Sequence, residues 1–224
     1  MVRFNSKIDL PSSDELPDCD GLPVDNELQT LVPNFLGLII AFIWSNRYNW
    51  FWGVNMGVYH TTGLNPRVPI VPDAFLSLGV ERTKRNQLRK SYVVWEENEV
   101  VPSFVLEVVS QTPDGEYHEK INAYAQMGVL YYVIYNPDFW RTDQHQPFEV
   151  YRLVNGVYQS QIGEPFWMPE IGLGIGRSVG EHLGLQREWL YWYDQKGNRF
   201  STPEELLNRY RERFGELAEN EEVS

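Results

Sequence analysis

One strand, helix and strand pattern constrains the fold more than any other part of the chain. The apolar, strand-forming run FVLEVVS (104–110) precedes a helical pattern over 116–127, and the apolar run VLYYVIYNPD (129–138) follows it. Gly128 stands where such a helix would end, because glycine readily adopts the left-handed conformation of a helix C-cap. This order predicts two parallel strands joined by a crossover helix, at the buried centre of a sheet.

Short runs rich in β-branched and aromatic residues fill much of the remaining chain, as strands would. They are WFWGVNMGVYH, VPIVPDAFLSL, SYVVWEE, PFEVYRLV, GVYQSQIG and REWLYWYD. GLGIG (172–176) is interpreted as a turn or bulge, since it lacks the strand-to-helix setting of a dinucleotide fingerprint. The aromatic cluster WLYWYD (189–194) is better explained by cross-strand pairs or a subunit contact than by stacking on unpaired bases.

Two further helices are predicted, one near each end of the chain. Apolar residues at helical spacing form a stripe in the first, with Asp25 as a plausible N-cap and Pro33 as a kink or boundary. The stripe consists of Leu28, Leu31, Phe35, Leu38 and Phe42. The segment from Ser201 onward has a serine or threonine cap, an early proline and charges suited to an exposed helix. The class is mixed α and β.

Composition limits where the protein works and what it binds. The 224 residues and 42% hydrophobic content suffice for one core, and a net charge of −12 opposes a surface that attracts nucleic acid everywhere. The lone cysteine, Cys19, rules out a disulfide framework within the chain, and the apolar run 35–44 is too short to cross a bilayer. We expect a cytoplasmic protein that does not enter a membrane.

Two acidic residues interrupt strand-like apolar runs. Glu107 lies inside FVLEVVS, and Asp73 follows Pro72 in VPIVPDAFLSL. An unpaired buried carboxylate is unfavourable by several kcal/mol, so something must compensate it. If the two strands pair, a divalent cation between the acids, Mg²⁺ or Mn²⁺, would resolve the repulsion. The alternative is that Asp73 closes a turn and Glu107 pairs with an arginine elsewhere.

A lysine on the crossover helix strengthens the metal hypothesis. Lys120 shares one helical stripe with Tyr117, Tyr124 and Met127, so it lies on the face that packs inward. There its ammonium could polarise a water nucleophile or stabilise charge on a phosphate. The competing explanation is an ion pair with Glu116, four residues earlier, and both can be partly true.

The combination of PD at 72–73, LEVVS at 106–110, EKINAYAQMGVLYYVIYNPD at 119–138 and EVYRL at 149–153 resembles a known family. It is the restriction-endonuclease family abundant in photosynthetic bacteria, within the PD-(D/E)XK nuclease superfamily. The resemblance, from about residue 27 to 192, implies a restriction-endonuclease-like core with a central mixed sheet flanked by helices. It further implies cleavage of phosphodiester bonds, of DNA in the first place, with Mg²⁺ or Mn²⁺.

The resemblance also implies roles for individual residues. Asp73 and Glu107 match the metal ligands, with the Val108 carbonyl as a third oxygen, and Lys120 matches the lysine on the following helix. The superfamily's commonest form places that lysine two residues after the acid, where this chain has Val109. Glu27 resembles the helical acid that completes many such sites, although an acid near the positive end of a helix dipole explains it equally well.

The remaining expectations concern partners and boundaries. ERTKRNQLRK (81–90) could meet the DNA backbone through five basic side chains, or be a solvated loop. The five are Arg82, Lys84, Arg85, Arg89 and Lys90. We expect a homodimer with an N-terminal arm (1–23), a nuclease-like domain (24–195) and a C-terminal helix with an acidic tail (196–224). The rival function is a catalytically silent nuclease fold that serves as an oligomeric binding or scaffold module.

Overall fold

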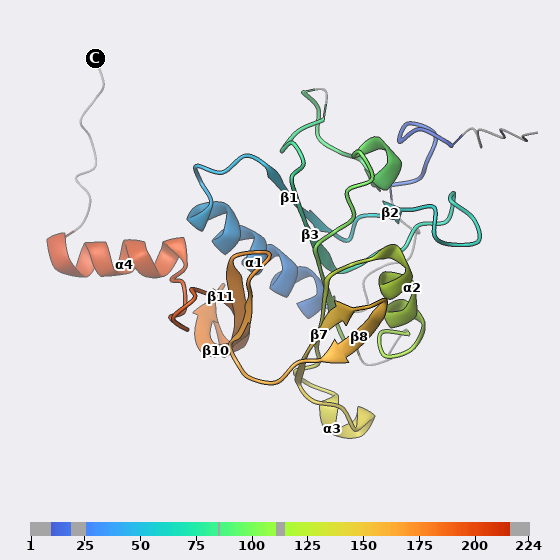
Figure 1. The fold of residues 1–224 in the computed structure, drawn as a ribbon. Coiled ribbons are helices and arrows are strands. Elements are labelled where there is room, and N and C mark those ends of the chain that lie inside the picture. Colours follow the sequence, from blue (N-terminus) through green and yellow to red (C-terminus); the bar gives the residue numbers. More distant parts are fainter. Residues whose placement is uncertain (1–9, 19–25, 85, 111–114, 216–224) are drawn as a thin grey trace, which may run out of the picture.

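The computed structural model describes residues 10–18, 26–84, 86–110 and 115–215 (Figure 1). The helices in these ranges are α1 (Leu28–Ile43), α2 (Glu119–Met127), α3 (Trp140–Asp143) and α4 (Pro203–Phe214), with one 3₁₀ turn (Val94–Glu96). The strands are β1 (Trp50–Val54), β2 (Val58–Tyr59), β3 (Ala74–Leu78), β4 (Tyr92–Val93), β5 (Phe104–Val108), β6 (Tyr131–Tyr135), β7 (Phe148–Val154), β8 (Val157–Ser160), β9 (Phe166–Met168), β10 (Leu173–His182) and β11 (Leu185–Tyr193).

A mixed six-stranded sheet forms the centre of the molecule, in the order β1-β3-β5-β6-β7-β8. Only β5 and β6 pair in parallel within it, and α2 connects them as the predicted crossover. Gly128 caps α2 with φ 91°, as expected for a helix that ends on glycine. The predicted mixed α+β class, with a restriction-endonuclease-like core, extra C-terminal strands and a terminal helix, is confirmed.

The two faces of this sheet are covered by different helices (Figure 1). Side chains alternate along a strand, so the even-numbered residues of β5 pack in the cluster that contains α1. The odd-numbered residues Val105 and Val109 pack instead with Tyr124 and Met127 of α2. Glu107 is odd-numbered as well, and therefore points to the α2 side.

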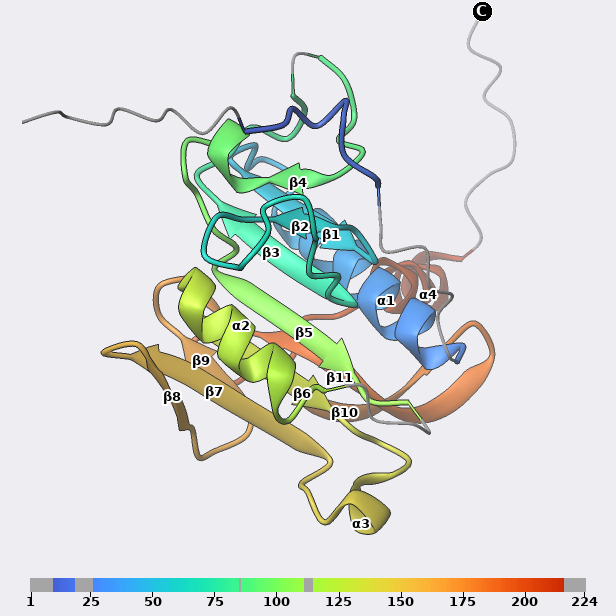
Figure 2. The same cartoon turned by 90° about the vertical axis from the view of Figure 1, so that its right-hand side faces the viewer.

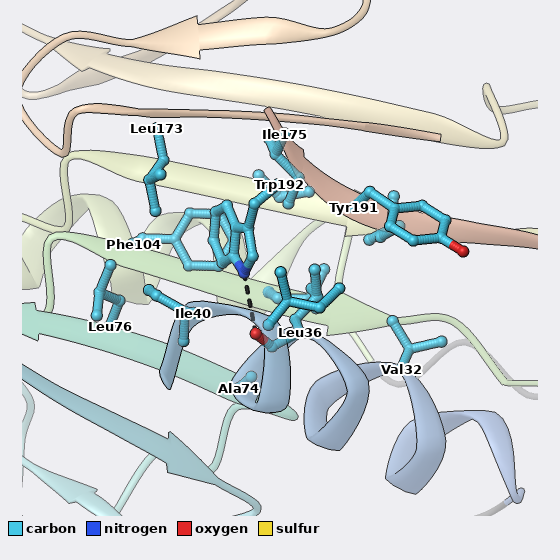
Figure 3. Packing of buried hydrophobic residues seen from close by; sticks show 14 of the residues in the cluster. Val32, Leu36, Ile40, Ala74, Leu76, Phe104, Leu173, Ile175, Tyr191 and Trp192 are labelled. Atoms are coloured by element: carbon cyan, nitrogen blue, oxygen red, sulfur yellow. Dashed lines mark hydrogen bonds between the residues drawn. The ribbon is translucent and has the colours of Figure 1, made fainter. Parts of the chain in front are cut away.

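A second sheet, β11-β10-β9, lies on the face of the main sheet opposite α2 and packs against α1 (Figure 2). Trp192 of β11 joins the layers: its ring centroid lies 5.5 Å from that of Phe104 on β5. Its indole Nε1–H also donates to the carbonyl of Leu36 in α1 at 3.0 Å (Figure 3). One hydrophobic core therefore runs from β5 through α1 to β11.

The predicted apolar stripe of α1 was wrong in part, for a packing reason. The buried face of α1 includes Val32, Leu36 and Ile39, whereas Leu38 and Phe42 of the predicted stripe are 47% and 46% exposed. The buried surface of α1 is wider than the predicted stripe, because both sheets pack against this helix. Pro33 also neither ends nor divides α1. Asp25, the expected N-cap, falls outside the described residues.

The GLGIG segment is strand rather than turn, because residues 173–176 open β10. A side chain at Gly176 would bring its Cβ within 2.9 Å of the Pro165 backbone, so glycine permits a close approach of two chain segments. The aromatic cluster at 189–194 behaves as predicted. Trp189 and Trp192 are fully buried, so they are not available for stacking on bases.

Candidate active site

The register of β3 and β5 brings the two interrupting acids together. Ala74 pairs with Leu106, so one further step along both strands sets Asp73 beside Glu107. Phe75 packs on the α2 side of the sheet, and Asp73, two residues earlier, shares that side. The prediction that paired strands would make these acids neighbours is confirmed.

Asp73 is held at the end of β5 by a main-chain donor. Its Oδ2 accepts the N–H of Val108 at 2.6 Å, and only 7% of the residue is exposed. Burial, followed by the nearby charge of Glu107, raises the pKa of Asp73 well above its usual range. Asp73 therefore does not simply close a turn: it is one member of a buried pair of carboxyl groups.

Glu107 is buried and bonded through both of its oxygens. Oε1 accepts the phenol hydrogen of Tyr124 at 2.6 Å, and Oε2 accepts from Nζ of Lys120 at 3.1 Å. Burial raises the pKa of Glu107 to about 7, although Lys120 and Tyr124 act in the opposite direction. A fixed orientation suits a cation-binding carboxylate, and a bound cation would offset the burial that disfavours its ionised form.

Lys120 reaches this pair from the first turn of α2. Its Nζ lies 3.1 Å from Glu107 and 3.4 Å from Glu116, so both interactions weighed for it from the sequence are present. Burial lowers the pKa of Lys120, but the neighbouring carboxylates outweigh burial and raise that pKa above its usual range. The lysine is consequently a cation at neutral pH.

Tyr124 and Glu116 belong to the site, although Tyr124 was predicted only as a member of the helical stripe and Glu116 only as a partner of Lys120. Tyr124 is fully buried, and its stripe position with Lys120 was the signal that could have identified it. Glu116 is 2% exposed, and its main-chain carbonyl accepts the hydroxyl of Tyr132 at 2.8 Å. A third carboxyl group thus lies 3.4 Å from Nζ of Lys120.

The N-terminus of α1 contributes a glutamine rather than the predicted acid. Gln29 donates its Nε2–H to the carbonyl of Val108 at 3.3 Å. Glu27 is exposed at the start of the helix, and in the described part of the chain no hydrogen bond or ion pair joins it to Asp73 or Glu107. Its catalytic role stays a prediction.

The site provides oxygen donors of the kind a small divalent cation takes. Within the described ranges, no three His, Cys, Asp or Glu side chains are grouped to hold an ion. Mg²⁺ nevertheless needs only one or two carboxylates, with water and substrate phosphate in its other positions. Asp73 and Glu107, with the Val108 carbonyl beside them, match that requirement.

Comparison with known proteins identifies a family for the chain. The sequence model of the Uma2 family, described as "Putative restriction endonuclease", matches residues 22–179. The chain belongs to the Uma2 family. No curated protein and no solved structure matches it significantly. The matched range contains Asp73, Glu107 and Lys120 and stops within β10, so β11 and α4 lie beyond the Uma2 match.

The basic run lies away from these residues. The guanidinium groups of Arg82 and Arg89 stand over the ring of Phe51, which pairs with Ser77. Ser77 is four residues along β3 from Asp73, or about 13 Å at the usual rise of a strand. The expectation that nearness in sequence brings this run to the site therefore loses its support.

Most of the described basic side chains in this run already have acidic partners. Arg89 is nearly buried and paired with Glu97, and Lys84 contacts Glu96 and Glu97. Lys90 lies 3.7 Å from Asp14, with both side chains largely exposed. Arg85 is outside the described residues. Contact of this run with nucleic acid stays a prediction.

No helix of the described residues is both long and apolar enough to cross a membrane.

Proposed function

We propose that this Uma2 family member is a divalent-metal-dependent nuclease that hydrolyses phosphodiester bonds, with DNA as its substrate. The observation that carries the proposal is the convergence of Asp73, Glu107 and Lys120 beneath the first turn of α2. Three segments that are separated in the sequence supply these groups. The family description supports a nuclease; the choice of metal and of DNA is our inference from the donor chemistry and the resemblance of the motifs.

The site residues have two roles: binding the cation and stabilising the negative charge of the phosphate. Asp73, fixed by the Val108 N–H, and Glu107, oriented by Tyr124, would hold Mg²⁺ or Mn²⁺. Such an ion, when bound, lowers the pKa of a coordinated water and neutralises phosphate charge. Binding it would also favour the ionised form of both carboxyl groups, whose pKa values burial raises.

Lys120 then acts as a charge stabiliser rather than as a base. Neighbouring carboxylates raise the pKa of its amine, which favours this role over that of a base. Its N–H groups can orient the attacking water or donate to a phosphate oxygen as the bond from water to phosphorus forms. The bond from phosphorus to the leaving oxygen breaks in the same displacement.

A plasmid-nicking assay tests the proposal. Wild type with Mg²⁺ or Mn²⁺ should convert supercoiled DNA to nicked or linear forms, whereas Asp73→Asn and Lys120→Met should not. Lys196→Met, at an exposed turn far along the chain, is the matched lysine control and should cut as wild type does. Intact plasmid under every metal and salt condition would refute the proposal for DNA, and a parallel RNA substrate separates the two polymers.

Thermal unfolding distinguishes a metal site from the silent-scaffold alternative. If Mn²⁺ binds the folded protein at this site, it raises the Tm of wild type but not that of Asp73→Ala. An ion that shifts both proteins equally, or neither, contradicts the metal site. A shift without plasmid cleavage would support a binding module that retains the cation.

A further inference from the structure

We propose that α4 is the dimerisation element of this protein, pairing antiparallel with α4 of a second copy. The helix lies beyond the Uma2 match and projects from the layer of α1 and β11 (Figure 1). It has no buried residue. The inference does not depend on nuclease activity.

The ends of α4 are strongly specified by its own sequence. Thr202 and Glu205 form a reciprocal capping box, with Pro203 in the first turn. Gly215 closes the helix, its N–H donating to the carbonyl of Arg211 at 2.8 Å. Even so, an isolated helix of 12 residues is marginal in water, and most helices owe their stability to a packed apolar face.

Such a face is present and open on α4. Leu206, Leu207, Tyr210 and Phe214 recur at the spacing of one helical stripe and are 37%, 37%, 46% and 63% exposed. The rings of Tyr210 and Phe214 already contact each other, with centroids 4.9 Å apart. Four large apolar side chains side by side form a continuous strip rather than scattered surface residues.

The charges of α4 identify a second copy as the occupant. The first turn carries Glu204 and Glu205, and the last turn carries Arg211 and Arg213. Glu204 and Arg211 are seven residues, or about two turns, apart and so lie on the same flank of the stripe. Antiparallel pairing centred between Leu207 and Asn208 sets Glu204 beside Arg211 of the partner subunit, whereas parallel pairing would set like charges together.

The same centring also sets the two apolar strips against each other, because it brings Leu206 to within one residue of the level of Tyr210 of the partner subunit. One face of a short helix buries less than the roughly 800 Å² per partner of a standard interface. We therefore expect a reversible dimer whose population rises with protein concentration. That behaviour is measurable with the full-length chain.

Sedimentation velocity over a wide concentration range tests the surface. Wild type should shift from monomer to dimer, and Tyr210→Glu should reduce association at least tenfold. Asn208→Glu, on the opposite side of α4, adds the same charge and should associate as wild type does. A wild type that remains monomeric throughout, or equal loss in both variants, overturns the proposal.

Cysteine trapping tests the orientation, in a Cys19→Ser background. In the antiparallel pair, Leu207→Cys lies close to its own copy and should form an intermolecular disulfide under mild oxidation. Phe214→Cys would be about 20 Å from its own copy, by the rise of a helix, and should not. Efficient cross-linking of both variants would indicate parallel helices and contradict the antiparallel pairing.

Discussion

Glu107 makes the stability of the metal-free protein depend on pH. The folded protein retains the proton on this carboxyl group up to a pKa of about 7, whereas an exposed glutamate releases it near 4.5. Between these values the folded state binds more protons than the unfolded state, so the free energy of unfolding falls as pH rises. The fall ends once the pH passes the folded pKa.

Glu107→Gln should flatten that dependence. In chelator, wild type is expected to lose roughly 1 to 3 kcal/mol of stability between pH 4.5 and pH 7.5 through this group, and the variant to lose less. The ion pair with Lys120 forms only where Glu107 is ionised, so its loss is contained in the slope, which is the readout. Urea denaturation at several pH values measures it; parallel slopes for the two proteins would show that Glu107 is ionised throughout.

Tyr124→Phe tests the orientation of Glu107 without changing charge. The hydroxyl at 2.6 Å from Oε1 is lost, while the buried ring is kept. We expect Mn²⁺ affinity, measured by calorimetry, to fall about tenfold, as for partners that orient metal ligands elsewhere. Tyr132→Phe is the matched control, since its hydroxyl bonds the main chain of Glu116 and should affect affinity little. Equal affinities of wild type and Tyr124→Phe would remove this role.

At the scale of elements, α1 is positioned by a contact that needs a residue without a side chain. A Cβ at Gly37 would lie 2.8 Å from Nε1 of Trp52, whose N–H donates to the carbonyl of Pro33 at 3.1 Å. Gly37 therefore lets the indole of edge strand β1 lie directly on the helix.

Gly37→Ala accordingly sets two effects against each other. Alanine favours a helix interior over glycine by about 1 kcal/mol, but overpacking of this kind typically is unfavourable by about 1 to 3 kcal/mol. We expect a net loss of stability in chemical denaturation and a change in Trp52 fluorescence. A more stable variant would show that the indole moves aside freely.

How far the sequence determines these elements differs along the chain. The crossover was predictable because Gly128 and two apolar runs specify it locally, and Thr202 and Pro203 likewise specify the start of α4. The buried face of α1 was not predictable in the same way, since a second sheet packs against the helix and widens its apolar contact. β10 was missed because its glycines serve close approach to Pro165, which no local pattern reveals.

For the site, the acids and the lysine were predictable from charged residues set in apolar patterns. Glu116 was predictable only as an ion-pair partner of Lys120, and Gln29 was not predicted, because its contribution depends on where α1 begins. The basic run was assigned by nearness in sequence, whereas strand β3 carries the chain about 13 Å away from Asp73 before the run begins. Local pattern therefore locates candidates, and register decides which of them meet.

At the scale of the whole molecule, one side chain joins both sheets through α1. Trp192→Ala would remove the contacts with Phe104 and Trp52 together with the hydrogen bond to Leu36. Truncation of a large buried aromatic residue typically lowers stability by 3–5 kcal/mol, roughly. Circular dichroism and fluorescence melting should shift together, because the sheets share this core.

Trp140→Ala, a half-buried residue of short helix α3, is the matched control and should change the Tm much less. If Trp192→Ala instead melted in two separate steps, the second sheet would be an independent unit. A single shifted transition supports one cooperative body.

The division of β5 into two faces bears on how related chains can be recognised. Val109 and Lys120 both border the α2 side of the sheet, one from the strand and one from the helix above it. A lysine at position 109 or at position 120 could therefore place its ammonium group near Glu107. A search keyed to a fixed interval between acid and lysine passes over such chains, whereas one keyed to a shared spatial neighbourhood finds them.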